Sequence, residues 1–481
     1  MYTRKRNLWK SIDWITILFY AMMVIAGWFS ICGASYEFDN TNLFNLAARP
    51  GLQLLWIGLS VGLIFIIMML DKDFFDIFAY LIYFIIILLL IATIFLAPEI
   101  KGSRSWLVLG PIRLQPAEFA KFATALAVAK FMSQYNFKLN TFKNFIITLL
   151  LIFLPVICIL LQKETGSALV YLAFFLVLYR EGMSGKVLLI GFCAVLFFVT
   201  NMKFSEATVG ITPIGELLVT IMILVITTLL TLSAGAKKYF MYSICGITAF
   251  AFLSGYLISL LIPVNFFWIG MGIILLLCCY LFYEAIHSWT MKYALIAFFA
   301  LSSLLFLFSI EYVFNNVLEP HQQVRIKVSL GLEDDPSGAG YNVNQSKIAI
   351  GSGGMTGKGF LNGTQTKLKY VPEQDTDFIF CTVGEEQGFI GSSLVIILFG
   401  AFIVRLILLA ERQETDFARI YGYSVASIFL FHLIINIGMV LGLTPVIGIP
   451  LPFFSYGGSS LWGFTFLLFI FLRLDSLRKE R

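Results

Sequence analysis

Apolar stretches of about 20 residues recur along the whole chain and are separated by short polar turns. An α-helix of that length crosses a hydrocarbon layer about 30 Å thick, so each stretch is a candidate transmembrane helix. The pattern indicates fourteen candidate spans, at 14–33, 52–70, 75–97, 117–133, 143–161, 166–180, 187–201, 213–233, 240–261, 265–284, 291–312, 391–410, 420–442 and 460–474. We therefore expect an all-α polytopic membrane protein that forms a single integral-membrane domain over residues 1–481.

The stretch from 187 to 312 leaves more than one arrangement open. Five spans fit there, but residues 201–215 are ambiguous and one pair of spans is also compatible with a re-entrant hairpin. Removing a pair would preserve the topology on either side.

Basic residues in the turns predict which side of the membrane each turn faces. The first apolar run follows Arg4, Lys5 and Arg6 and is too long for a signal peptide, so we expect a retained span. With a cytoplasmic N-terminus, every second turn is cytoplasmic, and these turns hold Lys72, Lys138, Lys143, Arg180, Lys186, Lys237, Lys238, Lys292, Arg405, Arg412 and Arg419. Because basic residues favour the cytoplasmic side, both termini are predicted to be cytoplasmic.

Composition excludes several classes of protein. The chain is 59% apolar and only 13% charged, which does not fit one water-soluble domain. Its basic residues lie singly between spans, which argues against a nucleic-acid partner. The seven cysteines lie mostly inside apolar runs and show no metal-ligand spacing, so neither a metal site nor a disulfide framework is expected from them.

Three polar segments are predicted on the outer side, at 98–116, at about 313–390 and at 444–460. Long polar loops in a compact protein are usually functional or disordered. The longest one interleaves apolar and aromatic residues with polar ones, so we expect it to form short interfacial helices.

Charged residues stand at the outer ends of several spans. Pro116 and Glu118 suit a helix start, and Glu118 shares a helix face with Lys121, either as an ordinary ion pair or as part of a functional site. Lys163 is compatible with a lysine that snorkels to the interface. The pair Glu385–Glu386 is compatible with a solvated rim. His432 is interpreted as a packed polar group inside the membrane.

The longest loop contains a glycine-rich stretch and the sequence Asp334–Asp335–Pro336. The spacing of its glycines and lysine does not match a phosphate-binding P-loop, so the glycines are interpreted as allowing tight turns and close backbone approach. Proline biases the residue before it toward extended backbone, which constrains how the Asp335 side chain projects. A solvated turn explains the same three residues.

Several long motifs carry a resemblance to a known family. The segments "DPSGAGYNVNQSKIAIGSGGMTGKGFLNGTQTKL", "VPEQDTDFIFCTVGEE", "GLTPVIGIPLPFFSYGGSS", "GSRSWLVLGPIRLQPAEFAK" and "KETGSALV" resemble the SEDS family (shape, elongation, division and sporulation). "GKGFLNGTQ" is closer to the elongation branch than to the division branch. The resemblance covers most of the chain except roughly 200–290. Since the family has ten spans, this region would be an even-numbered insertion of helices with unknown role.

The resemblance implies a peptidoglycan glycosyltransferase that polymerises lipid II on the outer face of the bacterial cytoplasmic membrane. The family's essential acidic residue falls on Asp335, and its helix-start residues fall on Glu118 and Lys121. An inverting displacement needs a base, for which we expect Asp335, and cations for the departing pyrophosphate. The candidates for that second role are Lys121, Arg104 and Lys358, or a divalent cation such as Mg²⁺ or Mn²⁺.

The resemblance also implies partners, namely a class B penicillin-binding protein that cross-links the strands and other membrane proteins of the elongation complex. The chain departs from the family pattern at Ala117, at Lys163–Glu164 and at Gln374–Asp375. Two other classes stay open, a lipid II flippase or transporter and a non-enzymatic scaffold for cell-wall synthases.

Overall fold

The computed structural model describes residues 11–36, 44–46, 48–71, 73–100, 102–109, 112–235, 238–333 and 339–477. The chain divides into two compact units, and each is described by itself. Unit 1 comprises Met1–Ser184 and Tyr341–Arg481, and unit 2 comprises Gly185–Gly340.

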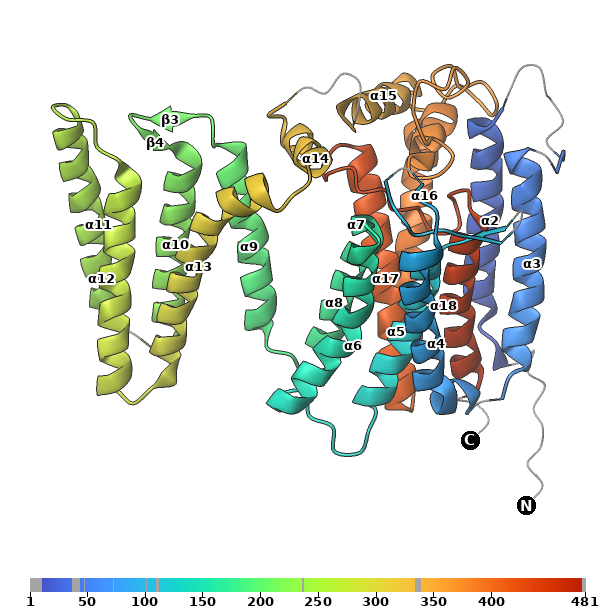
Figure 1. The fold of residues 1–481 in the computed structure, drawn as a ribbon, viewed down its shortest axis with the longest axis horizontal. Helices are drawn as coiled ribbons and strands as arrows, with labels where there is room; N and C mark the ends of the chain where they lie inside the picture. The colour runs from blue at the N-terminus through green and yellow to red at the C-terminus, as the bar shows by residue number, and fades with distance from the viewer. Residues whose placement is uncertain are drawn as a thin grey trace. The chain divides into compact units, whose positions relative to one another are not determined.

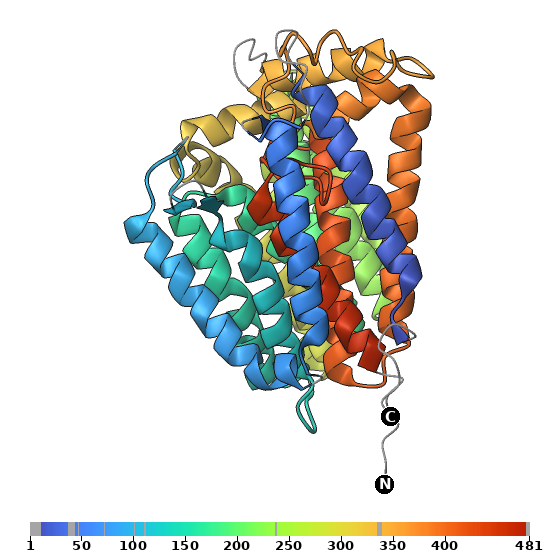
Figure 2. The same cartoon turned by 90° about the vertical axis from the view of Figure 1, so that its right-hand side faces the viewer.

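Unit 1 is a bundle of helices with one short hairpin (Figures 1 and 2). Its elements are α2 (Trp14–Ala34), α3 (Arg49–Met69), α4 (Phe74–Leu96), β1 (Leu107–Leu109), β2 (Ile112–Leu114), α5 (Pro116–Met132), α6 (Phe142–Leu161), α7 (Thr165–Leu169), the 3-10 turn η1 (Val170–Ala173), α8 (Phe174–Arg180), α16 (Ile379–Glu411), α17 (Asp416–Val440) and α18 (Gly458–Leu477). Most of α15 (Ala339–Ser352) also belongs to it. The strands pair antiparallel, with Leu107 opposite Leu114.

Unit 2 contains α9 (Gly185–Lys203), β3 (Thr208–Val209), β4 (Thr212–Pro213), α10 (Ile214–Ser233), α11 (Lys238–Ser259), α12 (Phe266–His287), α13 (Met291–Asn316) and α14 (Pro320–Leu330). One apolar cluster holds it together, with Phe197, Ile223, Ile274 and Leu304 among its buried members. These four side chains come from α9, α10, α12 and α13, so those helices form the core of the unit.

The class of fold is confirmed. Among the described residues, twelve helices are long and apolar enough to cross a membrane. The other two predicted spans, 117–133 and 166–180, correspond to α5, which has 17 residues, and to the shorter apolar segment Thr165–Arg180. The total of fourteen spans therefore stays a prediction.

The centre of unit 1 is formed by α5, α17 and α18. In α5 nearly every residue is buried, including a series of alanines whose small side chains allow close packing against α4, α6, α17 and α18. A short helix with charged residues is thus surrounded by longer apolar ones. Because α5 is enclosed by other helices, it can be shorter and carry more charged residues than a helix that faces lipid.

Two ends of unit 1 are distinguished below. The loop end carries α15 and residues 353–378, and the basal end carries the start of α2 and the end of α18 (Figure 1). The region predicted as a loop from 313 to 390 contains the end of α13, the helices α14 and α15, and the start of α16. Short helices are therefore present in it, while their interfacial position and the outer location of the region stay predictions.

Candidate active site

The start of α5 is fixed at the loop end by contacts with α18. Pro116 occupies the first helical position, where its missing N–H is not needed. The backbone N–H of Gln115 donates to the Ser459 hydroxyl at 3.2 Å, and that hydroxyl donates to the Arg113 carbonyl at 2.8 Å. The first turn of α5, which holds Glu118, is therefore held in place by the N-terminal turn of α18.

Glu118 and Lys121 form a buried ion pair in the first turns of α5. The Lys121 ammonium donates to a Glu118 carboxylate oxygen at 2.8 Å, and the two residues are only 2% and 3% exposed. The same ammonium lies 3.1 Å from His432 Nε2 and 4.6 Å from the centre of the Phe464 ring. A pair at the solvated start of a helix would be exposed, so burial separates this pair from an ordinary surface ion pair.

The surroundings of His432 determine its tautomer. Its Nδ1 lies 3.0 Å from the carbonyl oxygen of Pro450, which can only accept a hydrogen bond. Nδ1 therefore carries the proton, and Nε2 accepts from the Lys121 ammonium. The interpretation of His432 as a packed, buried polar group is confirmed, since the residue is 1% exposed.

Glu164 adds a second carboxylate to this cluster. It accepts hydrogen bonds from the Gln115 side-chain amide and, at 2.6 Å, from the Ser167 hydroxyl, while its other oxygen is buried with no partner among the described residues. Burial raises the pKa of Glu164, the Ser167 hydrogen bond opposes that rise, and the charge of Glu118 adds to it. Sequence reasoning missed Glu164 as a site residue; the available signal was a charged pair between two apolar runs.

Lys358 lies in a different cluster, against Glu385. Its ammonium donates to a Glu385 oxygen at 2.7 Å, and the backbone N–H groups of Thr364, Gln365 and Thr366 donate to the same carboxylate at 2.7–2.9 Å. Glu385 is fully buried and Glu386 is 3% exposed. The interpretation of this pair as a solvated rim is wrong, because residues 358–366 fold over Glu385 and satisfy its charge.

A break in α16 explains why the glycine-rich stretch is needed. Gly388 has a φ of 67°, which interrupts the helix and frees the carbonyl groups of Glu385 and Glu386. The backbone N–H groups of Lys358 and Gly359 donate to them at 3.0 and 2.9 Å. Gly357 has a φ of 79° and packs so closely on the Glu386 carbonyl that a side chain there would clash. The stretch thus serves close backbone approach.

Arg104 is the most exposed of the predicted cations. Its guanidinium lies 3.5 Å from the Glu99 carboxylate, and the two side chains are 57% and 55% exposed. Its backbone N–H donates to the Gln162 carbonyl at 3.0 Å, two residues before Glu164. The Arg104 side chain is therefore near the buried cluster in the chain path, but its present partner is on the surface.

The predicted site residues are thus brought together only in part. Glu118 and Lys121 contact each other, whereas Lys358 and Arg104 each have other carboxylate partners. Asp335, like Asp334, lies outside the described residues. In the part of the chain that the structure describes, no group of three His, Cys, Asp or Glu residues could hold a metal ion, so we derive no step through a divalent cation.

Comparison with known proteins shows the family to which the chain belongs. The model of the cell cycle protein family of FtsW, RodA and SpoVE matches residues 13–211 and 269–480, and α10 and α11 lie in the unmatched stretch between them. The chain is 31% identical over 416 residues to the peptidoglycan glycosyltransferase RodA of Treponema pallidum, covering 85% of this chain and 86% of that one. It is 29% identical over 406 residues to the peptidoglycan glycosyltransferase MrdB of Escherichia coli strain K12, covering 84% and 80%.

Solved structures share the fold. One, described under the words "Structural coordination of polymerization and crosslinking by a peptidoglycan synthase complex", matches with a TM-score of 0.62 at 23% identity, over 97% of this chain and 98% of that one. The crystal structure of the rod shape determining protein RodA of Thermus thermophilus matches with a TM-score of 0.55 at 20% identity, over 98% and 99%.

Proposed function

The chain belongs to the FtsW, RodA and SpoVE family of cell cycle proteins and is a peptidoglycan glycosyltransferase of cell elongation, and we propose that its substrate is lipid II. The observation that carries the proposal is the buried Glu118–Lys121 pair at the loop end of unit 1. Ionisable groups in a membrane protein are costly to bury, and this pair lies beside the buried Glu164 carboxylate, one oxygen of which has no partner among the described residues, so the cluster as a whole indicates a functional site.

The proposed reaction is one inverting displacement at the sugar carbon that bears the pyrophosphate. The acceptor hydroxyl loses its proton to a base, the new glycosidic bond forms, and the polyprenyl pyrophosphate departs. We assign the base to Asp335, on the strength of its Asp-Pro motif. A positioned general base contributes roughly 10²–10⁴-fold to such a rate.

The three proposed pyrophosphate ligands differ in how readily they can respond to substrate. The Arg104–Glu99 pair is exposed and long, so it contributes little and can be exchanged for a phosphate. Lys358 is tied to the buried Glu385, and its release would leave that carboxylate without its cation. Lys121 donates to Glu118 and His432, which leaves one of its three N–H groups for substrate. Arg104 is therefore the first candidate to contact the pyrophosphate, and Lys121 supplies positive charge that is fixed in position by its contacts with Glu118 and His432.

The proposed location is the bacterial cytoplasmic membrane, with both termini cytoplasmic and the loop end outside. Arg180, Arg405, Arg412 and Arg419 lie in turns or helix ends that the positive-inside rule assigns to the cytoplasm. Cysteine labelling with an impermeant reagent in intact cells tests this orientation. A single cysteine at Ser337 should react and one at Gly235 should not.

We further propose that a class B penicillin-binding protein works with this chain and cross-links the strands that it makes, together with other membrane proteins of the elongation complex. The support is the shared fold with a protein of a peptidoglycan synthase complex. Co-expression with the transpeptidase should raise the rate of polymerisation. Equal rates with and without it would contradict the dependence.

The decisive experiment supplies purified chain with lipid II and measures glycan polymer. Asp335→Asn keeps the side-chain size but cannot take up a proton, so polymerisation should fall by roughly 10²–10⁴-fold. Asp334→Asn is the matched control and should retain activity. If Asp334→Asn is the inactive variant and Asp335→Asn polymerises normally, the base is wrongly assigned; if neither matters, Glu118 becomes the leading candidate.

A further inference from the structure

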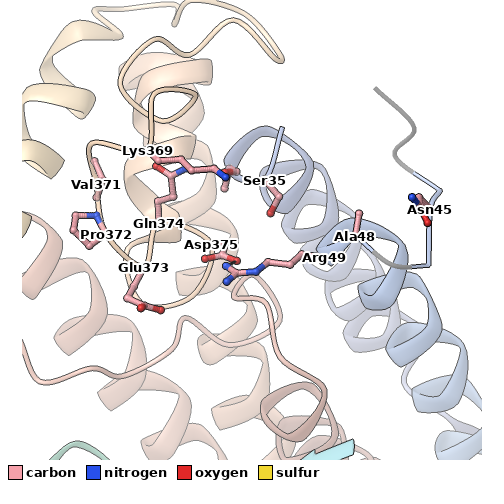
Figure 3. Close-up of a pocket in the computed structure, with 11 residues that line it drawn as sticks. Ser35, Asn45, Ala48, Arg49, Lys369, Val371, Pro372, Glu373, Gln374 and Asp375 are labelled. Atoms are coloured by element: carbon pink, nitrogen blue, oxygen red, sulfur yellow. Dashed lines mark hydrogen bonds and ion pairs between the residues drawn. The ribbon is translucent and has the colours of Figure 1, made fainter. Parts of the chain in front are cut away.

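A polar pocket of about 480 Å³ lies at the loop end (Figure 3), and neither Glu118 nor Lys121 is among its lining residues. It is lined by the end of α2, the start of α3 and the loop Lys369–Asp375. Its volume is in the range of ordinary ligand sites.

One wall of the pocket presents an arginine with most of its donors unused. Figure 3 shows Arg49 and Asp375 pointing toward each other across the pocket. One guanidinium nitrogen of Arg49 pairs with the Asp375 carboxylate, which is 4% exposed, while the Arg49 side chain is 56% exposed. The Asp375 backbone is anchored in turn, since its carbonyl accepts from the Tyr456 N–H at 2.8 Å. A guanidinium has five N–H donors. The contact with Asp375 therefore fixes the orientation of the Arg49 guanidinium and leaves N–H donors that can bind an anion.

Two buried polar atoms in the lining have no partner among the described residues. The Gln374 side chain is 5% exposed, and its amide nitrogen donates to the carbonyls of Ala34 and Thr366, both at 2.6 Å. Because both partners are carbonyl groups, the amide orientation is determined, and the Gln374 oxygen is the atom without a donor. The Ser35 hydroxyl is the second such atom. An unsatisfied buried polar atom is costly, so the Gln374 oxygen favours a ligand with a hydrogen-bond donor, whereas the Ser35 hydroxyl can meet either a donor or an acceptor.

The lining loop Lys369–Asp375 contains two residues in an unfavourable backbone conformation. Lys369 and Glu373, which both line the pocket, have φ values of 56° and 53°, in the left-handed region that side chains disfavour. Strained backbone of this kind concentrates at ligand clamps and active sites. These two strained positions place one basic side chain, Lys369, and one acidic side chain, Glu373, in the pocket lining.

This set of groups discriminates between the parts of a peptidoglycan precursor. A pyrophosphate has no N–H donor for the Gln374 oxygen, and its several negative charges would be repelled by Asp375 and Glu373 more strongly than the single charge of a carboxylate. A sugar has no charge for the guanidinium fork. A peptide offers a carboxylate for Arg49 and N–H donors for the Gln374 oxygen, and carboxylates are the preferred bidentate partner of arginine.

We propose that this pocket binds the peptide part of the lipid-linked substrate, with Arg49 receiving a peptide carboxylate and Gln374 accepting a peptide N–H. The proposal rests on the proposed function for its substrate. The pocket would recognise the substrate, whereas the displacement itself would be catalysed elsewhere, with Asp335 as the proposed base.

A kinetic comparison tests the proposal. The substrates are lipid II and the same lipid-linked disaccharide with its peptide replaced by a methylamide, so that no carboxylate is left on the sugar. Arg49→Gln/Asp375→Asn removes both charges together, so no buried carboxylate is left unpaired. We expect KM for lipid II to rise about tenfold, as for loss of one charge-assisted hydrogen bond, with kcat retained and KM for the peptide-free substrate unchanged. Lys367→Gln, two residues before the loop Lys369–Asp375 and outside the pocket lining, should change neither value.

Direct binding separates failure of this proposal from failure of the proposed function. The solubilised full chain is titrated with the free peptide and with the same peptide amidated at its carboxyl terminus. We expect the acid to bind more tightly than the amide, and the double variant to lose that difference, whether or not glycan is made. Equal binding of acid and amide, or an equal rise in KM for both lipid substrates, would overturn the assignment. Absence of polymer from the wild-type chain with either substrate would instead refute the proposed function.

Discussion

Replacement of Glu118 by Gln tests what the buried ion pair does. The change would leave the Lys121 ammonium at a site that is 2% exposed, with no carboxylate partner and with His432 as its acceptor. Removing one member of a buried pair destabilises a protein by about 3–5 kcal/mol, because the remaining charge is uncompensated. We expect the free energy of unfolding, measured by denaturant titration in mixed micelles, to fall by that amount.

The double variant Glu118→Met/Lys121→Met separates stability from activity. It removes both charges and keeps similar side-chain volumes, and such replacements are often neutral or stabilising by about 1–4 kcal/mol. We expect its stability to return to at least that of the wild type. Polymerisation should still be reduced by about 100-fold or more, since fixed positive charge opposite a developing pyrophosphate is a large term.

An exposed pair of the same spacing supplies the control. Asp416 and Arg419 are also three residues apart and lie 3.0 Å from each other, but the Asp416 side chain is 59% exposed. Asp416→Asn should therefore cost less than about 1 kcal/mol and leave glycan synthesis unchanged. A double Met variant that makes glycan at the wild-type rate would refute the functional role of the pair, and a Glu118→Gln variant as stable as the wild type would refute the argument from burial.

Three further changes have defined outcomes. Glu385→Gln should lower the free energy of unfolding by about 3–5 kcal/mol, because it leaves a cation and three backbone N–H groups beside a neutral amide; proteolysis within residues 358–366 should accelerate in parallel. Gly357→Ala should lower the thermal stability, because its side chain would clash with the Glu386 carbonyl and its φ is positive, whereas alanine at the uncrowded Gly400 should not. Burial raises the pKa of Asp13, but hydrogen bonds, led by that from Arg405, outweigh it and the pKa is lowered. A lowered folded-state pKa contributes stability above the unfolded value that is lost as the pH falls through the folded one, so Asp13→Asn should flatten the stability profile below about pH 4.

The sequence predicted where the helices lie better than it predicted which side chains contact each other. Apolar runs of membrane length are a local signal, and twelve of them are helices long enough to span. The Glu118–Lys121 pair was also accessible, since residues three apart share a helix face and the structure shows them paired. By contrast, His432 is 311 positions from Lys121, and no local pattern indicates that they touch.

Burial of charged residues was the least accessible feature. Hydropathy treats Glu385 as a surface residue, and its burial depends on how a loop about 20 residues earlier folds back over it. The partnership of Arg49 with Asp375, 326 positions apart, depends in the same way on tertiary structure. Motif resemblance indicated which segments matter, but only the fold shows which carboxylates are already neutralised by cations.

The two ends of unit 1 treat buried polar groups differently, and the difference supports the location of the site. At the basal end, Asp13 and Asp475 are buried and each receives hydrogen bonds from two nitrogen atoms of one arginine, Arg405 and Arg412 respectively. At the loop end, several buried side-chain atoms have no partner among the described residues: Ser35 Oγ, Gln162 Oε1, Glu164 Oε2 and Gln374 Oε1. Both ends bury charge, so burial alone does not mark the site. Unpaired buried atoms also occur inside helical segments, at Tyr171 and Ser392, but at the loop end they include oxygens of the Glu118–Lys121 cluster and of the pocket, and we propose that the polar headgroup meets these.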